Sequence, residues 1–192
     1  GLQTTDSSGV SRSYVEMYTG ALAGKNIKWA TLNTTLLYSW WGDGSATHTE
    51  LYLANGFGWG TDWNSQPWVA NIPGVPAYQS SSNVTNQSKA PNVSMVFGAT
   101  GAVAHAAANS WGSVSFLLKG SREDNTTSWR RFGLNPYLEV RYNSTPNNPV
   151  GHLMQNGTVP CAKGDNRPWI ATRTPVVQAR VSDPDGGSLG VH

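Results

Sequence analysis

The sequence predicts an all-β protein, an antiparallel β-sandwich with one short helix, and three observations lead to that prediction. Short runs of alternating apolar and polar residues recur along the chain, and a period of two is typical of half-buried strands. Turn-forming residues separate these runs, with 21 Gly and 11 Pro among the 192 residues. Only 12% of the residues are charged, while 9 Trp, 7 Tyr and 4 Phe supply enough apolar surface for a core.

Each alternating run is assigned to a strand in the order in which it occurs. The first run extends from Ser13 to Met17, and a longer one follows from Lys28 to Tyr38. Further runs of the same period lie at residues 50–53, 93–97, 113–118 and 137–142. Because Gly, Asn and Pro punctuate the sequence between them, we expect short strands joined by turns.

Residues 100–109 break the alternation and are expected to form a short helix. The segment is rich in alanine, the best helix former, and Thr100 is placed to cap its first turn. Val103, Ala106 and Ala107 then share one face of the helix. His105 lies on the flank of that face, where a surface or capping position is favoured over a catalytic one.

A change of composition near Thr145 predicts two parts. Asn143 opens a stretch rich in Pro and Asn that is typical of a linker. We therefore place a sandwich domain at residues 1–144, and a linker with the opening of a second β-sandwich at residues 145–192. The strand expected at 174–181 cannot bury a core by itself.

The charge balance excludes several classes of partner. A net charge of +2 is too small for a phosphate-dominated nucleic-acid surface, and no apolar run approaches the ~20 residues that a membrane span requires. The abundance of hydroxyl, amide and Trp side chains favours a secreted, extracellular or cell-surface protein. The one cysteine, Cys161, is expected to pair with a cysteine beyond His192.

No catalytic constellation is recognisable, so we expect a protein that is not an enzyme. The sequence contains no Gly-rich phosphate loop and no His-x-x-x-His pair. Glu16 and Glu139 are expected to alternate outward on strands. Nothing in the sequence pairs two carboxylates across a cleft, as glycoside hydrolysis requires.

Aromatic residues between positions 40 and 78 are the most informative class. Sugar rings present C–H faces that stack on flat aromatic rings, so a sugar-binding protein needs exposed aromatics on a sheet face or loop rim. Three tryptophans are candidates for ligand binding, namely Trp41, Trp59 and Trp68. The alternative is that such residues fill the core, which is the position expected for Trp29 and Trp111.

A basic set further along the chain adds candidate ligand-binding residues. It consists of Arg122, Arg130 and Arg131, with Lys119 nearby. A guanidinium group can bind a carboxylate through two parallel hydrogen bonds. The alternative is structural ion pairing, because Glu123 and Asp124 supply counter-charges within the same segment.

Several stretches, in consistent order between residues 10 and 142, resemble one family. They are Arg12–Met17, Gly20–Leu32, Thr61–Pro67, Gly98–Lys119, Trp129–Phe132 and Asn135–Tyr142. Together they resemble the DNRLRE-type domain, a jelly-roll module of secreted bacterial proteins whose members include alginate-binding carbohydrate modules. The tail, at Asp165–Thr172 and the Asp183 turn, resembles the Ig-like segment that follows this domain in large actinobacterial surface proteins.

The resemblance implies a jelly-roll sandwich, the start of an Ig-like segment, and a polysaccharide partner whose uronate carboxylates meet basic side chains. Relatives often carry a cysteine in the strand that ends at Tyr38–Asp43 here, paired with another near Ser80–Ser82. Neither cysteine is present, so packing alone must hold the first domain. Jelly-roll modules often hold a structural Ca²⁺ through loop carboxylates. The candidate ligands are Asp43, Asp62, Asp183 and Asp185.

The sequence therefore favours a non-catalytic carbohydrate-binding module of a secreted or surface multidomain bacterial protein. Exposed Trp and polar groups would attach it to polysaccharide, and further domains of the same polypeptide would be its neighbours. The alternative is a structural or adhesive spacer of a large surface or toxin-delivery protein, with no glycan ligand. A weaker alternative is an accessory domain of a polysaccharide lyase.

Overall fold

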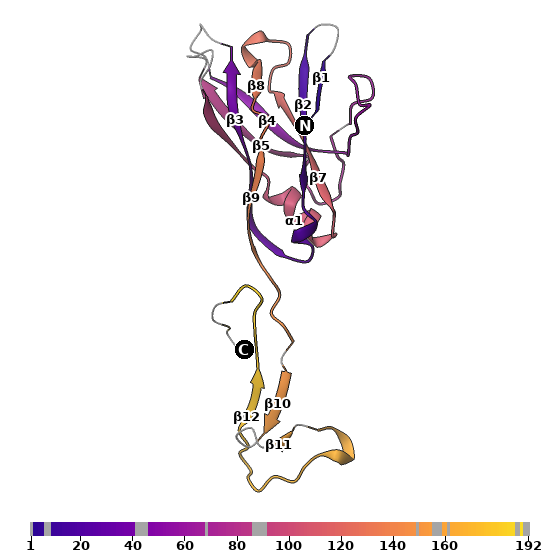
Figure 1. Ribbon diagram of the computed structural model, residues 1–192, viewed down its shortest axis with the longest axis vertical. Coiled ribbons are helices and arrows are strands. Elements are labelled where there is room, and N and C mark those ends of the chain that lie inside the picture. The colour runs from indigo at the N-terminus through magenta and orange to yellow at the C-terminus, as the bar shows by residue number, and fades with distance from the viewer. Residues whose placement is uncertain are drawn as a thin grey trace. The chain divides into compact units, whose positions relative to one another are not determined.

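The larger part of the chain forms a β-sandwich. The computed structural model describes residues 2–5, 9–40, 46–67, 69–85, 92–148, 150–154, 159–160, 162–186 and 189. The chain forms two compact units, a larger unit (Gly1–Asn143) and a smaller unit (Ser144–His192). Two antiparallel sheets and one short α-helix make up the larger unit, which confirms the predicted fold class (Figure 1).

The first sheet of the larger unit has five strands. Their order is β1 (Leu2–Thr5), β2 (Ser11–Tyr18), β7 (Ser113–Gly120), β4 (Ala46–Ala54) and β5 (Tyr78–Thr85). Strand β7 lies at its centre, where Phe116 pairs with Val15 of β2 and Leu53 of β4. The alternating runs predicted β2, β4 and β7. Strand β5 was not predicted because its sequence, YQSSSNVT, is polar throughout the middle.

The second sheet is built around one long strand. It contains β3 (Asn26–Ser39), β6 (Val93–Gly98), β8 (Arg130–Phe132) and β9 (Tyr137–Asn143). Strand β6 pairs with one edge of β3, and β9 and β8 pair with the other edge in succession. The register of β3 against β9 shifts between Ile27 and Trp29. Beyond the shift the register is regular, and Trp29 lies on the face opposite to the buried Ala30 and Leu32, so the expectation that it is buried was wrong.

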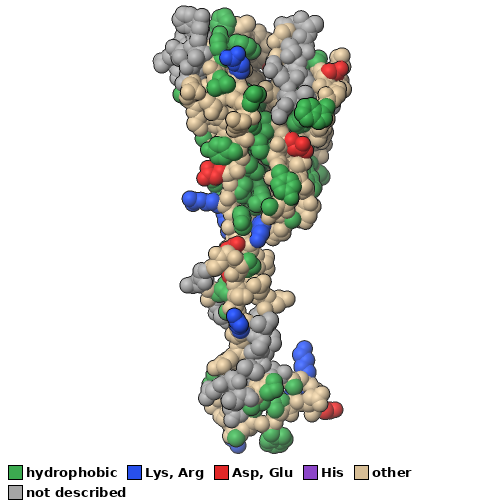
Figure 2. All heavy atoms as spheres, in the orientation of Figure 1, with side chains coloured by type: hydrophobic (Ala, Val, Ile, Leu, Met, Phe, Trp, Pro, Cys, Tyr) green, Lys and Arg blue, Asp and Glu red, His purple; other side chains and the backbone are tan. Residues whose placement is uncertain are grey.

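The core lies between the inner faces of the two sheets. Strand alternation places the apolar members of each run on this side. The fully or nearly fully buried side chains include Val15, Leu51, Leu53, Phe116 and Leu118 from the first sheet and Leu32, Leu36, Met95 and Phe97 from the second. In Figure 2, further hydrophobic side chains form a band along the middle of this unit's visible face, where charged side chains are sparse.

Helix α1 (Thr100–Ala108) covers one end of the core. The predicted face is buried, with Val103, Ala106 and Ala107 fully enclosed. Thr100 does not cap the helix, contrary to expectation. Its hydroxyl instead accepts a hydrogen bond from the backbone N–H of Ala30, 3.0 Å away, and so ties the helix to β3. Among the described residues no helix is long and apolar enough to cross a membrane.

Short elements complete both units. The larger unit also contains the 3₁₀ turns η1 (Gly20–Leu22) and η2 (Thr126–Ser128). The smaller unit holds β10 (Val150–Met154), β11 (Val159–Pro160), η3 (Gly164–Asn166) and β12 (Val177–Arg180), with β10 central in a three-stranded antiparallel sheet. The strand expected at 174–181 is therefore present but shorter. The assignment of this unit as the start of an Ig-like segment stays a prediction.

Candidate ligand-binding groove

Two adjoining cavities open into the larger unit. The inner cavity has a volume of about 500 Å³ and lies between the sheets, walled by β2, β4 and β7 on one side and by β3, β8 and the loop after β8 on the other. The outer cavity, of about 390 Å³, lies over the loop that follows β7. Both are lined by Ser11, Gly120, Ser128 and Trp129. We refer to the two cavities together as the groove.

A fixed turn positions the residues at the junction of the two cavities. The side-chain oxygen of Asn125 accepts a hydrogen bond from the backbone N–H of Thr127, 2.9 Å away, and so caps η2. One guanidinium nitrogen of Arg130 donates to the backbone carbonyls of Thr127 and Trp129, both at 2.8 Å. These bonds hold the backbone on each side of Ser128 and fix where Trp129 leaves the turn.

Gly120 lets this turn pack directly against the end of β7. A Cβ atom at Gly120 would lie 2.8 Å from the Cβ atom of Ser128 and 3.1 Å from its carbonyl oxygen. Real Cβ atoms do not approach other atoms so closely, so any larger residue would push η2 away. Glycine is therefore needed at position 120 for the contact between η2 and β7, which shapes the groove, and not for the strand itself.

Two half-exposed indoles line the groove. Trp129 is 45% exposed, and its ring meets the ring of Tyr38 edge-on with 4.7 Å between the centroids. Trp40 is 38% exposed, and its backbone N–H donates to the carbonyl of Trp129 at 3.2 Å. A backbone hydrogen bond joins the two segments, and the ring contact with Tyr38 further restrains Trp129. A ligand that binds these indoles would therefore lose little additional conformational entropy of the protein.

The three predicted arginines all line the groove. Arg122 lines the outer cavity and lies 3.8 Å from Asp124, with both side chains largely exposed. Arg130 and Arg131 line the inner cavity, and the guanidinium of Arg131 lies 5.9 Å from the centre of the Tyr38 ring. Within the described part of the chain, Arg131 has no acidic side chain in ion-pair distance. The ion-pairing alternative therefore fits Arg122, and it does not fit Arg131 within the described residues.

Of the three predicted tryptophans, only Trp59 belongs to the described residues, and it does not line the groove. Trp59 is fully exposed at the tip of a loop and lines neither cavity. Trp41 and Trp68 lie outside the described residues. Trp40 and Trp129 were not among the predicted ligand-binding residues, although Trp129 directly precedes two of the candidate arginines. That adjacency is the signal that could have identified it.

Trp59 belongs to a loop that covers the outer face of the first sheet. Phe57 packs against Tyr14 of β2, with 5.7 Å between ring centroids. The loop tip is closed by Thr61, whose hydroxyl accepts from the Gly58 N–H at 3.1 Å and whose own N–H donates to the Gly58 carbonyl at 3.1 Å. The exposed indole of Trp59 thus lies on a turn that two hydrogen bonds hold in place, which makes it a second candidate contact for a ligand.

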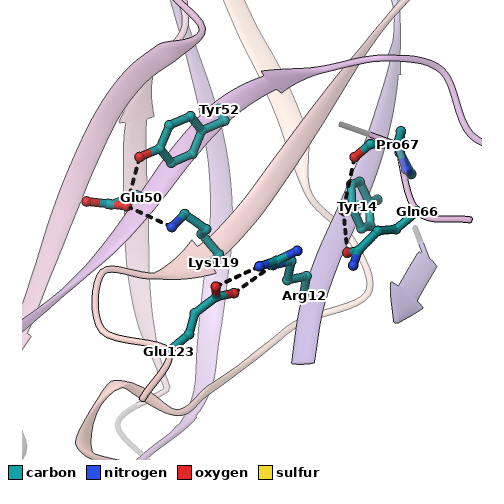
Figure 3. A network of polar contacts seen from close by, with 8 residues as sticks. All are labelled: Arg12, Tyr14, Glu50, Tyr52, Gln66, Pro67, Lys119 and Glu123. Atoms are coloured by element: carbon teal, nitrogen blue, oxygen red, sulfur yellow. Dashed lines mark hydrogen bonds and ion pairs between the residues drawn. The ribbon is translucent and has the colours of Figure 1, made fainter. Parts of the chain in front are cut away.

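Charged groups on the same outer face neutralise one another (Figure 3). Arg12 makes two parallel hydrogen bonds to the carboxylate of Glu123, at 2.7 and 2.8 Å, and its guanidinium lies 4.7 Å from the centre of the Trp63 ring. The bonds to Glu123 raise the pKa of Arg12 above its ordinary value. Because the two residues are 111 positions apart in sequence, this pair fastens the loop after β7 to β2.

A neighbouring cluster on this face holds a phenol with a high pKa. The hydroxyl of Tyr52 donates to Glu50 at 3.0 Å, and Lys119 lies 3.7 Å from the same carboxylate oxygen. Burial, followed by the hydrogen bond to Glu50, raises the pKa of Tyr52 to about 12. The phenol of Tyr14 also has a raised pKa, mainly through burial.

The phenol of Tyr52 is therefore expected to ionise well above the ordinary pKa of a tyrosine. A folded-state pKa above the unfolded value of about 10 contributes stability that is complete below pH ~10 and is lost as the pH rises toward 12. Absorbance at 295 nm, taken as the difference between the wild type and Tyr52→Phe, should show a step near pH 12. Glu50→Gln should move that step to lower pH, whereas Glu139→Gln on the other sheet should not. A step near pH 10 in that difference would contradict the hydrogen bond and burial assigned to Tyr52.

The three candidate metal ligands that the structure describes, Asp62, Asp183 and Asp185, each accept hydrogen bonds from other protein groups. The carboxylate of Asp62 accepts from the N–H and hydroxyl of Ser65, both at 2.8 Å, and these bonds lower the pKa of Asp62. Asp183 accepts from the Asp185 N–H at 2.8 Å, and Asp185 accepts from both the N–H and the hydroxyl of Ser144.

Asp43 and Cys161 lie outside the described residues, so the expectations placed on them stay predictions. The residues that the structure describes contain no group of three or more His, Cys, Asp or Glu able to hold a metal ion. The structural Ca²⁺ also stays a prediction.

Comparison with known proteins adds no assignment. No family model matches the chain, and no curated protein matches it. The resemblance to the DNRLRE-type domain therefore remains a prediction from the motifs quoted above.

Proposed function

We propose that the larger unit is a non-catalytic carbohydrate-binding module with the groove as its binding site. In this proposal it holds a secreted or surface multidomain protein on a polysaccharide. The observation that carries the proposal is the gathering of two half-exposed indoles, Trp40 and Trp129, with all three predicted arginines along one groove.

The chemistry of the groove suits a glycan. Indole faces stack on the C–H faces of sugar rings, and guanidinium groups donate to ring hydroxyls or to acidic substituents. The inner cavity alone falls within the 300–1,000 Å³ that is typical of small-molecule sites. Arg131, which has no acidic neighbour among the described residues, supports an interaction with a sugar carboxylate or hydroxyl.

Affinity electrophoresis in gels that contain alginate, pectin, xylan, mannan or starch tests the proposal. The wild type should be retarded by at least one of these polysaccharides, and Trp129→Ala should weaken that retention about tenfold or more, since a central aromatic anchor carries much of a binding energy. Trp169→Ala is the matched control, because Trp169 is exposed in the smaller unit and lines neither cavity.

Trp59→Ala distinguishes the groove from the exposed loop. Full retention of this variant supports the groove as the site. Loss of retention by Trp59→Ala together with full retention of Trp129→Ala would move the site to the outer face of the first sheet. A wild type that no polysaccharide retards would favour the spacer interpretation.

A further inference from the structure

We infer that the inner cavity is a subsite for one neutral sugar residue at the end of a bound chain. The inference rests on the proposed function and adds two things to it. It names the part of the glycan that enters the protein, and it states that this part carries no charge.

Two buried hydroxyl groups carry the inference. Thr49 is 1% exposed and Ser128 is 6% exposed, and both line the inner cavity. Neither hydroxyl oxygen has a hydrogen-bond partner among the residues that the structure describes. Buried polar groups in folded proteins are nearly always paired with protein, water or a ligand, so each of these hydroxyls has capacity for an incoming group.

The topology of the first sheet brings these two hydroxyls to one place. Thr49 of β4 pairs with Gly120 of β7, and the absence of a side chain on Gly120 allows Ser128 to pack against that same point. The two hydroxyls therefore lie in one small region where β4, β7 and η2 meet.

The side chains around this region provide the same two kinds of surface as a sugar ring, hydroxyl groups and apolar groups. Further hydroxyls come from Ser11, Ser13 and Thr34, and apolar surface comes from Leu37, Leu118 and Phe132. A sugar ring has the same two kinds of surface, hydroxyls at its rim and C–H groups on its faces. Each Ser or Thr hydroxyl both donates and accepts, so it can pair with a sugar hydroxyl in either sense.

The charges near the inner cavity are already occupied or lie in solvent, which favours a neutral ring. Lys119 faces Glu50 at 3.7 Å, and Arg130 donates to two backbone carbonyls. Arg131 is exposed, so its charge is not at the buried end beside Thr49. A carboxylate placed at that end would lose its hydration, while two of the cations that line the cavity, Lys119 and Arg130, already bind Glu50 and two backbone carbonyls.

The depth of the inner cavity favours a terminal sugar residue of the glycan over an internal one. A ring that reaches Thr49 and Ser128 must pass below the surface, and core residues Val15 and Leu118 line the cavity beyond. A sugar residue with neighbours on both sides cannot occupy such a position, whereas a terminal residue has a neighbour on one side only. The rest of the chain then lies toward Trp129 and the outer cavity.

Titration of the methyl-labelled wild type with glucose, galactose, mannose, xylose and N-acetylglucosamine tests the inference by NMR. At least one of these sugars should shift the Thr49 and Leu118 methyl resonances along a saturable curve. Removal of the Thr49 hydroxyl in the near-isosteric Thr49→Val should weaken binding of that sugar about tenfold, as followed by the Leu118 methyl. Thr35→Val, on an exposed part of β3, is the matched control and should leave the affinity unchanged.

The thermal midpoint of unfolding provides a readout that separates binding from folding. Thr49→Val should keep or raise the midpoint, because it removes a buried hydroxyl that has no hydrogen-bond partner among the described residues. If no sugar shifts the cavity resonances, if only glucuronate shifts them, or if Thr49→Val binds like the wild type, the inference is overturned. The proposed function survives these outcomes if polysaccharide gels still retard the wild type in a manner that depends on Trp129.

Discussion

Phe97→Ala is expected to lower the free energy of unfolding of the larger unit by about 3–5 kcal/mol. Phe97 is fully buried on the inner face of β6, opposite Leu32 of β3, and it belongs to the cluster in which the two sheets meet. Truncation to alanine removes the ring from this cluster and leaves a cavity that close-packed neighbours can fill only in part. Urea unfolding followed by tryptophan fluorescence measures the effect.

Val96→Ala is the matched control for this substitution. Val96 is the preceding residue in the same strand, but its side chain is on the opposite face and is about half exposed. Its truncation should cost less than ~1 kcal/mol. Similar losses for both variants would mean that β6 does not present one face to a closed core, and the sandwich would be wrong at that strand.

Gly120→Ala is expected to lower the free energy of unfolding by about 1–3 kcal/mol and to weaken glycan binding in the same variant. The new methyl group would lie 2.8 Å from the Cβ atom of Ser128, and neither atom is the end of a flexible side chain that could move aside. The turn at Ser128 must shift, and Trp129 shifts with it. Urea unfolding and retention in polysaccharide gels measure the two effects.

Gly112→Ala provides the comparison, because it precedes the same strand at its other end. A Cβ atom at Gly112 would meet no atom within 4 Å. This variant should be neutral, or more stable by up to ~1 kcal/mol, because alanine restricts the unfolded chain. A Gly120→Ala protein as stable as Gly112→Ala would show that the contact between η2 and β7 is loose.

The sequence contained enough information for the strands that alternate and too little for those that do not. Strand β7 is a clear case, because its apolar residues recur in a short run bounded by Gly112 and Gly120. Strand β5 lies at a sheet edge, where polar residues such as Ser81 and Ser82 are tolerated on both faces. Strand β8 has three residues, too few to show any period.

Individual orientations depended on features that no local pattern reveals. Trp29 and Ala30 are adjacent apolar residues, and only the packed sandwich shows that Ala30 takes the inner face while Trp29 takes the outer one. Thr100 has the residue type of a helix cap, but its hydroxyl instead bonds the backbone of Ala30. In both cases tertiary packing decides the outcome.

The arginines of the groove were predictable from the sequence, whereas its tryptophans and its shape were not. Arg130 and Arg131 were selected by chemical type, and the structure places both along the inner cavity. Their meeting with Ser11, Thr49 and Leu37 requires the strand order β2–β7–β4 and the attachment of β8 to β3. Such an order follows from the packing of the whole unit, which the spacing of residues along the chain does not encode.

The central position of β7 has a consequence for how the chain reaches its native state. Strands β2 and β4 are not neighbours, and each can dock in the first sheet only through β7, which begins at Ser113. A polypeptide that emerges in order from its N-terminal side therefore carries the unpaired edges of β2 and β4 until the segment that begins at Ser113 has appeared. Pairings between such distant segments close slowly, on the order of milliseconds to seconds, and during that interval the exposed edges are open to chaperones and to self-association.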